Sequence, residues 1–206
     1  MSLKKIYLIR HGQTDFNKNG IVQGRGIDAS LNDEGRKQAA AFYQAYQNVP
    51  FDKIYISELK RTRESVQKFI DKGVPVEALD GLNEIGWGVA EGTHFTGKNK
   101  HHYFDILQHW QEGHIHEKVE QGESPFEVQQ RQQKALDKIL SQDEEKTVLI
   151  CMHGRAIRIL LCWIQGLSLG LMDTFPHNNL CLYELEYADN KFEVKTFNDI
   201  RHLVDT

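Results

Sequence analysis

Short apolar runs alternate along the chain with longer stretches in which apolar residues recur every three or four positions. The runs are rich in β-branched and aromatic residues, as buried strands are, and they predict strands over residues 3–9, 53–56, 74–79 and 147–151. The periodic stretches predict helices over residues 32–48, 58–71, 124–140 and 156–164. Because strands and helices alternate, the pattern predicts an α/β layer fold with a largely parallel sheet.

Local sequence signals predict where two of the helices start and how the sheet ends. Asn32 is an expected N-cap. Ser124 is followed by a proline and, three residues on, by Glu127, which predicts a capping box. Residues 180–187 and 192–197 predict two strands joined by a short turn, so we expect a C-terminal antiparallel hairpin.

The chain has 206 residues, which predicts a single domain over residues 1–206. Residues 83–121 depart from the pattern because they are polar, rich in glycine and histidine, and only weakly periodic. We therefore expect this segment to be an excursion on the substrate side of the domain.

Charge and composition narrow the class of partner. Lys and Arg total 25 against 29 Asp and Glu, a formal net charge of −4, which argues against a nucleic-acid partner or a membrane-surface partner. No apolar run approaches the roughly 18 residues of a membrane span. The three cysteines, an odd number, each lie in an apolar run and predict reduced thiols in a cytoplasmic protein.

Two predicted strands end in the same dipeptide. One leads into Arg10, His11 and Gly12, and the other leads into His153 and Gly154. In parallel sheets ligands bind at the carboxyl ends of the strands, so neighbouring strands would bring both histidines into one crevice. A helix that starts just after Gly154 would point its N-terminus there, which favours an anion. A strand-end histidine is also often only a hydrogen-bonded structural residue.

Two arginines fit an anion at this crevice. Arg10 precedes the first histidine, and Arg61 lies near the start of the second predicted helix, just after a strand. Each guanidinium is a planar fork suited to bidentate phosphate contacts.

Ordered motifs along nearly the whole chain resemble the histidine phosphatase superfamily, also called the phosphoglycerate mutase-like family. They occupy residues 8–17, 23–31, 55–62, 82–92, 122–124 and 151–154, with a tail at 198–203. Two positions depart from the family pattern: Ser30 stands where phosphatases more often have proline, and Ser65-Val66 stands where Thr-Ala is usual.

The resemblance implies a three-layer α/β/α sandwich with a mostly parallel sheet and a metal-independent phosphomonoesterase that needs no cofactor. His11 would attack the phosphorus and form a phosphohistidine, with its other ring N–H held by a backbone carbonyl. Arg10, Arg61 and a cationic His153 would stabilise the phosphoryl group. Glu84 would protonate the leaving alcohol and then activate water, with Glu91 as the competing carboxylate.

The remaining expected site residues contact the phosphate or the leaving group, and they are Asn17, Gln23, Gly24 and Gly154. The substrate is expected to be a small-molecule phosphate ester. A homodimer is one option for the assembly, which the sequence leaves open. Four side chains of the excursion are candidates for the leaving-group pocket, namely Trp87, His101, Tyr103 and Trp110.

Three other functions compete with this hypothesis. A cofactor-dependent phosphoglycerate mutase would carry a longer insertion after the acid/base glutamate, with clustered basic residues, whereas the excursion here holds no arginine up to Glu123. An inactive family member that only binds a phospholigand would not need the intact set of candidate catalytic residues. A serine hydrolase would use Ser168 in a G-x-S-x-G pattern, but a helical period rather than a strand precedes it.

Two further patterns are weak. Residues 24–29 match a relaxed dinucleotide fingerprint but do not directly follow a strand. The excursion also concentrates six of the ten histidines without the regular spacing of a zinc site, so we expect them at the surface or in the substrate pocket; they are His94, His101, His102, His109, His114 and His116.

Overall fold

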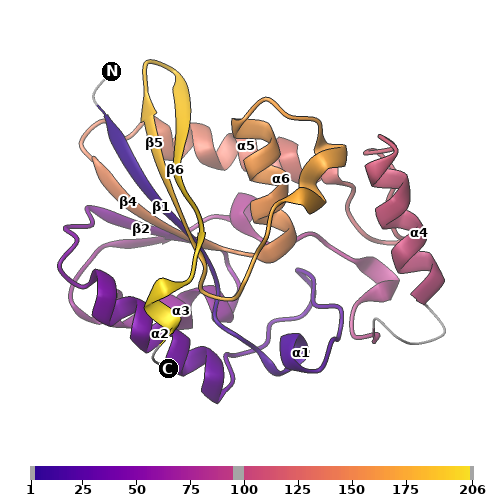
Figure 1. The fold of residues 1–206 in the computed structure, drawn as a ribbon, viewed down its shortest axis with the longest axis horizontal. Helices are drawn as coiled ribbons and strands as arrows, with labels where there is room; N and C mark the ends of the chain where they lie inside the picture. The colour runs from indigo at the N-terminus through magenta and orange to yellow at the C-terminus, as the bar shows by residue number, and fades with distance from the viewer. Residues whose placement is uncertain (1–2, 95–99, 205–206) are drawn as a thin grey trace.

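The computed structural model describes residues 3–94 and 100–204, and these build one six-stranded sheet flanked by helices (Figure 1). The strands are β1 (Lys4–Arg10), β2 (Lys53–Ile56), β3 (Val76–Ala78), β4 (Thr147–Met152), β5 (Leu182–Ala188) and β6 (Lys191–Asp199). Their order across the sheet is β3-β2-β4-β1-β5-β6. The first four strands pair in parallel, and the β5–β6 hairpin adds antiparallel strands beside β1. Both features of the predicted sheet are confirmed.

The predicted helices are all present, and two more appear. The helices are α1 (Asp15–Lys18), α2 (Asp33–Tyr46), α3 (Lys60–Asp71), α4 (Lys100–Gln111), α5 (Pro125–Leu140) and α6 (Gly154–Ile164). The sequence pattern did not predict α1, which is a single turn, or α4, which lies in the excursion. The third strand was predicted too long, because only Val76–Ala78 pair with β2.

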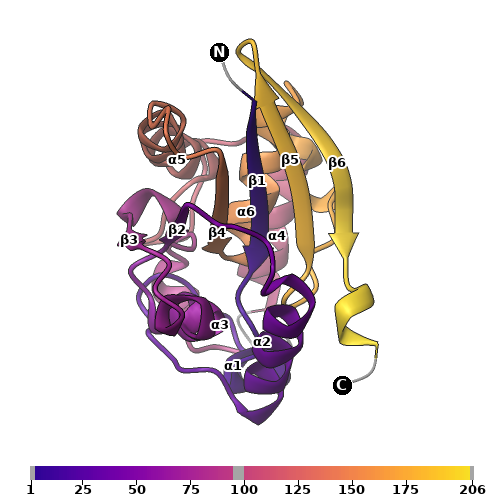
Figure 2. The same cartoon turned by 90° about the vertical axis from the view of Figure 1, so that its left-hand side faces the viewer.

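Side chains of the central strands alternate between two apolar cores. In β4, Ile150 and Met152 belong to the core that also contains residues of α5 and α6, whereas Leu149 and Cys151 belong to the core formed with α2 and α3. A period of two with both faces buried is the pattern of a sheet covered on each side. Figure 2 shows α2 and α3 on one side of the strands and α5 and α6 on the other. The predicted three-layer sandwich is therefore confirmed.

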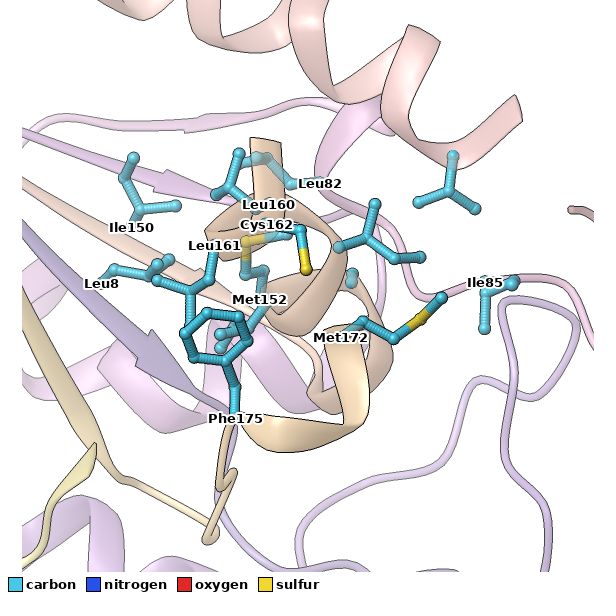
Figure 3. Packing of buried hydrophobic residues seen from close by; sticks show 14 of the residues in the cluster. Leu8, Leu82, Ile85, Ile150, Met152, Leu160, Leu161, Cys162, Met172 and Phe175 are labelled. Atoms are coloured by element: carbon cyan, nitrogen blue, oxygen red, sulfur yellow. The ribbon is translucent and has the colours of Figure 1, made fainter. Parts of the chain in front are cut away.

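Helix α6 packs on the sheet through several almost fully buried side chains. Figure 3 shows its residues Leu160, Leu161 and Cys162 beside Leu8 of β1 and Ile150 of β4, all of them almost fully buried. This packing fixes the start of α6 directly after the end of β4.

The pairing of β1 with β4 sets the position of the candidate site. The two strands run parallel with Arg10 opposite Met152, so the residues that follow them, His11 and His153, lie side by side at the carboxyl edge of the sheet. The chain reaches β2 on the far side of β4, which makes this edge a topological switch point where ligands bind in open α/β sheets.

Both predicted helix caps are present. The Asn32 side chain accepts a hydrogen bond from the Gly35 amide at the start of α2. Ser124 and Glu127 form the reciprocal capping box at the start of α5. In the described part of the chain, no helix combines the length and the apolarity needed to cross a membrane.

The Ser124 cap generates a stability prediction. Ser124 is buried and its hydroxyl accepts from the Glu127 amide, so Ser124→Ala should lower the free energy of unfolding by about 1 kcal/mol in urea titrations. Ser141, at the other end of the same helix, is exposed and donates only to a carbonyl of the last turn. Ser141→Ala is therefore the matched control, and an equal loss in the two variants would contradict the capping argument.

Candidate active site

A cavity of about 250 Å³ opens at the carboxyl ends of β1 and β4. Its walls come from the segment after β1, the excursion, the start of α6 and the loop before β5. The lining residues are Arg10, His11, Asn17, Ile21, Val22, Gln23, Glu84, Trp87, Tyr103, Gly154, Arg155, His177 and Asn179. Six of the nine predicted site residues are among them, and Arg61, His153 and Gly24 are not.

His11 lies in the wall of the cavity with one ring nitrogen already engaged. Its Nδ1 is 2.7 Å from the Gly12 carbonyl oxygen, which can only accept, so Nδ1 carries the proton and donates. The lone pair is then on Nε2. Burial, together with the charges of Arg61 and Arg10, holds the pKa of His11 well below its ordinary value. His11 is therefore a neutral imidazole with a single available nucleophilic nitrogen.

Two buried N–H donors that line the cavity have no hydrogen-bond partner within the described residues: Arg10 Nε and Gln23 Nε2. Other atoms of both side chains are anchored, since Arg10 Nη1 donates to the His177 carbonyl and Gln23 Oε1 accepts from Thr14. Buried donors without partners are costly in a native structure. An anion in the cavity would satisfy both.

Arg61 and His153 form a layer behind His11. The His153 ring lies 5.1 Å from the His11 ring, centroid to centroid. Arg61 Nε donates to His153 Nδ1 at 3.2 Å, so that nitrogen holds a lone pair, and His153 Nε2 donates to the Ser57 hydroxyl at 2.8 Å. Burial and the Arg61 charge lower the pKa of His153 well below its ordinary value. In this geometry the His153 ring is therefore neutral, and a cationic His153 stays a prediction for the site with a phosphate dianion bound.

The Arg61 guanidinium is held by backbone as well as by His153. Its two Nη atoms donate to the carbonyls of Ile27 and Gly24, at 2.7 and 3.2 Å. Burial lowers its pKa to about 10, which still leaves it charged at neutral pH. Gly24 thus contributes through its carbonyl to the support of Arg61. A Cβ at this position would come within 2.1 Å of a Glu91 oxygen.

Glu84 bridges the excursion and the start of α6. One carboxylate oxygen accepts from the amides of Ile85 and Ala156, and the other accepts from the amide of Arg155. The carboxylate therefore sits on the N-terminus of α6, where backbone N–H groups lack helical partners. Glu91 does not line the cavity and instead accepts from the amides of Trp87 and Gly26. The geometry favours Glu84 over Glu91 as the carboxylate that meets a ligand.

Asn17 and Gly154 complete the predicted set. The Asn17 amide oxygen accepts from Thr14 N and Asn179 Nδ2, which fixes its side chain in the wall. Gly154 is the first residue of α6, and a Cβ there would come within 2.5 Å of the His177 ring. Only glycine lets His177 and Arg10 approach the backbone so closely.

Three polar lining residues were not among the predicted site residues. Arg155 follows His153-Gly154 and could have been noticed from that position alone. His177 and Asn179 lie in a loop with no periodic signal, and only the pairing of β5 with β1 brings them here. Among the pocket guesses, Trp87 and Tyr103 do line the cavity, whereas Trp110 is buried behind Trp87. The His101 side chain lies outside the described residues.

The serine-hydrolase pattern and the described histidines of the excursion do not contribute to the cavity. Ser168 is exposed and caps a short 3-10 helix (Leu169–Thr174) after α6, so no strand precedes it as a nucleophile elbow requires. The histidines at 94, 109, 114 and 116 are exposed, and the side chain of His102 falls outside the described residues. Over residues 3–94 and 100–204, no group of three His, Cys, Asp or Glu side chains is placed to hold a metal ion.

Comparison with known proteins identifies the class. The family model of the histidine phosphatase superfamily (branch 1) matches residues 6–200, and the chain belongs to this family. An uncharacterized phosphatase of Bacillus subtilis, PhoE, is 31% identical over 201 residues, 96% of each chain. A probable phosphoglycerate mutase of Erwinia tasmaniensis, GpmB, is 28% identical and covers 98% of this chain and 96% of its own.

A solved structure agrees. A mutant of the phosphoserine phosphatase of Entamoeba histolytica, in complex with phosphoserine, superimposes with a TM-score of 0.85 at 27% identity, over 98% of this chain and 100% of its own. Family membership and the phosphatase names of these relatives identify the chain as an enzyme of the phosphoric monoester hydrolase class.

The neutral buried histidines make the fold sensitive to acid. His11 and His153 have lowered pKa values in the folded state, whereas in the unfolded chain both take up a proton below a pKa of about 6.5. The unfolded state therefore binds more protons, and the free energy of unfolding should fall with decreasing pH below that value, by about 1.4 kcal/mol per pH unit for each histidine. Urea titrations between pH 7 and pH 5 measure this slope.

A substitution of His11 measures how much this histidine contributes to the pH dependence of the free energy of unfolding. His11→Asn should reduce the slope by about 1.4 kcal/mol per pH unit, half of what the two histidines supply together. The exposed His109, whose pKa is raised by Glu117, provides the control, since His109→Asn should not reduce the loss of stability in acid. An unchanged slope in His11→Asn would contradict the neutral, buried state of His11.

Proposed function

We propose that this protein is a metal-independent phosphomonoesterase that hydrolyses small phosphorylated metabolites through a phosphohistidine on His11. The observation that carries the proposal is the pairing of a neutral, tautomer-fixed imidazole with unsatisfied N–H donors in one cavity. His11 presents Nε2 as a nucleophile. Arg10 Nε and Gln23 Nε2 are donors unpaired over the described residues, and an anion in the cavity would satisfy them.

In the first step, the His11 Nε2 lone pair attacks phosphorus and the bond from phosphorus to the ester oxygen breaks. Charge on the three transferring oxygens is stabilised by Arg10 and Gln23, whose Nε and Nε2 donors have no partner among the residues that the structure describes. Glu84, at the start of α6, donates a proton to the departing oxygen. The leaving alcohol departs neutral and the phosphoryl group remains on His11.

In the second step, water attacks the phosphohistidine. Glu84, now a carboxylate, takes a proton from the water, and the bond from phosphorus to Nε2 breaks with its electron pair returning to His11. The Gly12 carbonyl keeps Nδ1 protonated throughout. One group thus serves as acid and then as base, which divides a difficult hydrolysis into two easier transfers.

Arg61 and His153 support this chemistry from behind the cavity. The Arg61 charge contributes to the low pKa of His11, so the nucleophile is unprotonated at neutral pH. His153 contacts the His11 ring and is itself fixed by Arg61 and Ser57. Guanidinium groups supply the positive charge that a metal ion supplies in other phosphatases, which is why we propose a metal-independent reaction.

The size of the cavity supports a small substrate. About 250 Å³ is below the roughly 300–1,000 Å³ of pockets that take drug-sized ligands, which favours a small ester over a large one. The excursion 83–121 supplies Glu84, Trp87 and Tyr103 to the walls, which supports its assignment to the substrate side. Three buried cysteines without disulfides support the cytoplasm as the location.

A phosphoglycerate mutase is the second candidate, because a relative of similar length carries that name. Both activities begin with transfer of a phosphoryl group to His11. They differ in whether the phosphohistidine meets water or a second hydroxyl group. Incubation with 3-phosphoglycerate separates the two, since a phosphatase releases inorganic phosphate and a mutase accumulates 2-phosphoglycerate.

Replacement of the nucleophile provides the main test. His11→Ala should reduce the hydrolysis of p-nitrophenyl phosphate to background, because it removes the Nε2 lone pair that is proposed to attack phosphorus. The assay contains a chelator, and His109→Ala serves as the matched control, since His109 is exposed and outside the cavity. Undiminished turnover in His11→Ala would overturn the phosphohistidine mechanism, and loss of wild-type activity in the chelator would overturn metal independence.

The proton donor is tested through the leaving group. In Glu84→Gln the hydrolysis of alkyl phosphates should fall by about 10²–10⁴-fold. The first transfer from p-nitrophenyl phosphate should fall much less, because nitrophenolate leaves without a proton. Stopped-flow measurements should therefore show a burst of nitrophenol followed by slow turnover. An equal loss in both transfer rates would contradict the assignment of Glu84 as the acid.

A further inference from the structure

Positive charge exceeds negative charge beside the wall of the cavity that Trp87 forms. Asp173 Oδ1 accepts from Nη1 of both Arg155 and Arg158, at 2.6 and 2.8 Å. One carboxylate can neutralise only one of the two guanidinium groups. The three side chains together therefore leave about one unit of positive charge beside the cavity.

The Arg155 guanidinium lies against the aromatic wall of the cavity. Its central carbon is 5.9 Å from the Trp87 ring centroid and 5.8 Å from that of Trp110. It also hydrogen-bonds Tyr103, and Trp87 and Tyr103 both line the cavity. Only 7% of Arg155 is exposed, so this charge is largely removed from water.

Arg155 keeps donor capacity for a ligand. A guanidinium carries five N–H groups in a rigid fork. The ion pair with Asp173 uses a donor on Nη1 and the Tyr103 hydrogen bond uses another, so the fork retains further N–H groups. Arg158 does not line the cavity, and its Nε donates to the Phe175 carbonyl. Of the two arginines, Arg155 is the one that faces a leaving group.

The charges of a bound ester can be matched to these groups. A phosphate dianion at His11 is balanced by Arg10 and Arg61, and Glu84 is uncharged when it holds the proton that it donates. The surplus positive charge of Arg155, Arg158 and Asp173 then remains without a counter-ion. A leaving group with a single negative charge would balance it, and an uncharged one would leave a buried cation without full compensation.

We propose that the leaving group carries a carboxylate that pairs with Arg155, so that the substrates are small phosphorylated hydroxy or amino acids. A planar carboxylate suits the guanidinium fork, and the small cavity suits a short carbon skeleton. This inference rests on the proposed phosphatase function and assigns Arg155 as the residue that determines specificity within it.

Two matched substrate pairs test the inference. O-phosphoserine and O-phosphoethanolamine differ by one carboxylate, and so do 3-phosphoglycerate and glycerol 3-phosphate, in which a hydroxymethyl group replaces it. In the wild type, kcat/KM should favour the carboxylate member of at least one pair by about tenfold or more, because an analogue without the carboxylate leaves buried donors unpaired. The two pairs separate amino acids from hydroxy acids as the source of the carboxylate.

The ratio within a pair is the readout in the variants, since a general loss of folding or catalysis lowers both members alike. Arg155→Met should bring the ratio close to one, and Arg155→Lys should retain part of the preference. Lys195→Met removes an exposed cation of β6 that pairs with Glu186 and Glu193, and it should keep the wild-type ratio.

Two outcomes overturn the inference: a wild-type ratio near one in both pairs, or an unchanged ratio in Arg155→Met, which would reduce Arg155 to a structural ion pair. In either case, hydrolysis of p-nitrophenyl phosphate that depends on His11 would leave the proposed function standing. If no ester is turned over, the proposed function fails, and calorimetric titration with the same pairs tests the carboxylate preference as binding.

Discussion

The parallel pairing of β1 with β4 is the constraint on which the rest of the site depends. Residues far apart in sequence reach the same edge because these two strands are neighbours and in register, with Arg10 opposite Met152. Both strands place side chains in the two cores on opposite faces of the sheet, so a shift by one residue would exchange the side chains of the two cores. The rigidity of the sheet is thereby transferred to His11 and His153.

A second consequence of this arrangement is electrostatic. Arg10 and Arg61 lie close to two buried histidines, and this concentration of positive charge disfavours protonation of either ring. His177, in the same wall, follows the same rule, since burial and Arg10 lower its pKa to about 2. In the proposed reaction the two arginines thus act twice: they attract the phosphate, and they help to keep the attacking imidazole in its neutral form before the phosphate arrives.

Much of this was accessible from the sequence, because its signals were local or repeated. Apolar runs and helical spacing predicted the sheet and its main helices, and the common strand ending of His11 and His153 predicted one crevice. Ser124, followed by Pro125 and Glu127, predicted the start of its helix. What the sequence could not show depends on tertiary contacts: the neutral state of His153 follows from a bond with Arg61, and His177 reaches the cavity only through the β5 pairing. Helix α4 was missed although its apolar residues at 103, 106, 107 and 110 stand at helical spacing, because it lies within a longer polar, histidine-rich segment.

Position 155 contributes to the cavity through two separate parts of one residue. Its backbone N–H donates to Glu84, while its side chain lies against Trp87 and Tyr103. Any residue except proline supplies that N–H, so the support of the Glu84 carboxylate survives nearly every substitution here. The side chain is not bound by that constraint. With the roles proposed for Glu84 and Arg155, a single codon can therefore change which molecules are recognised while the support of the proton donor is inherited intact, and this separation gives an evolving lineage a short route to new substrates.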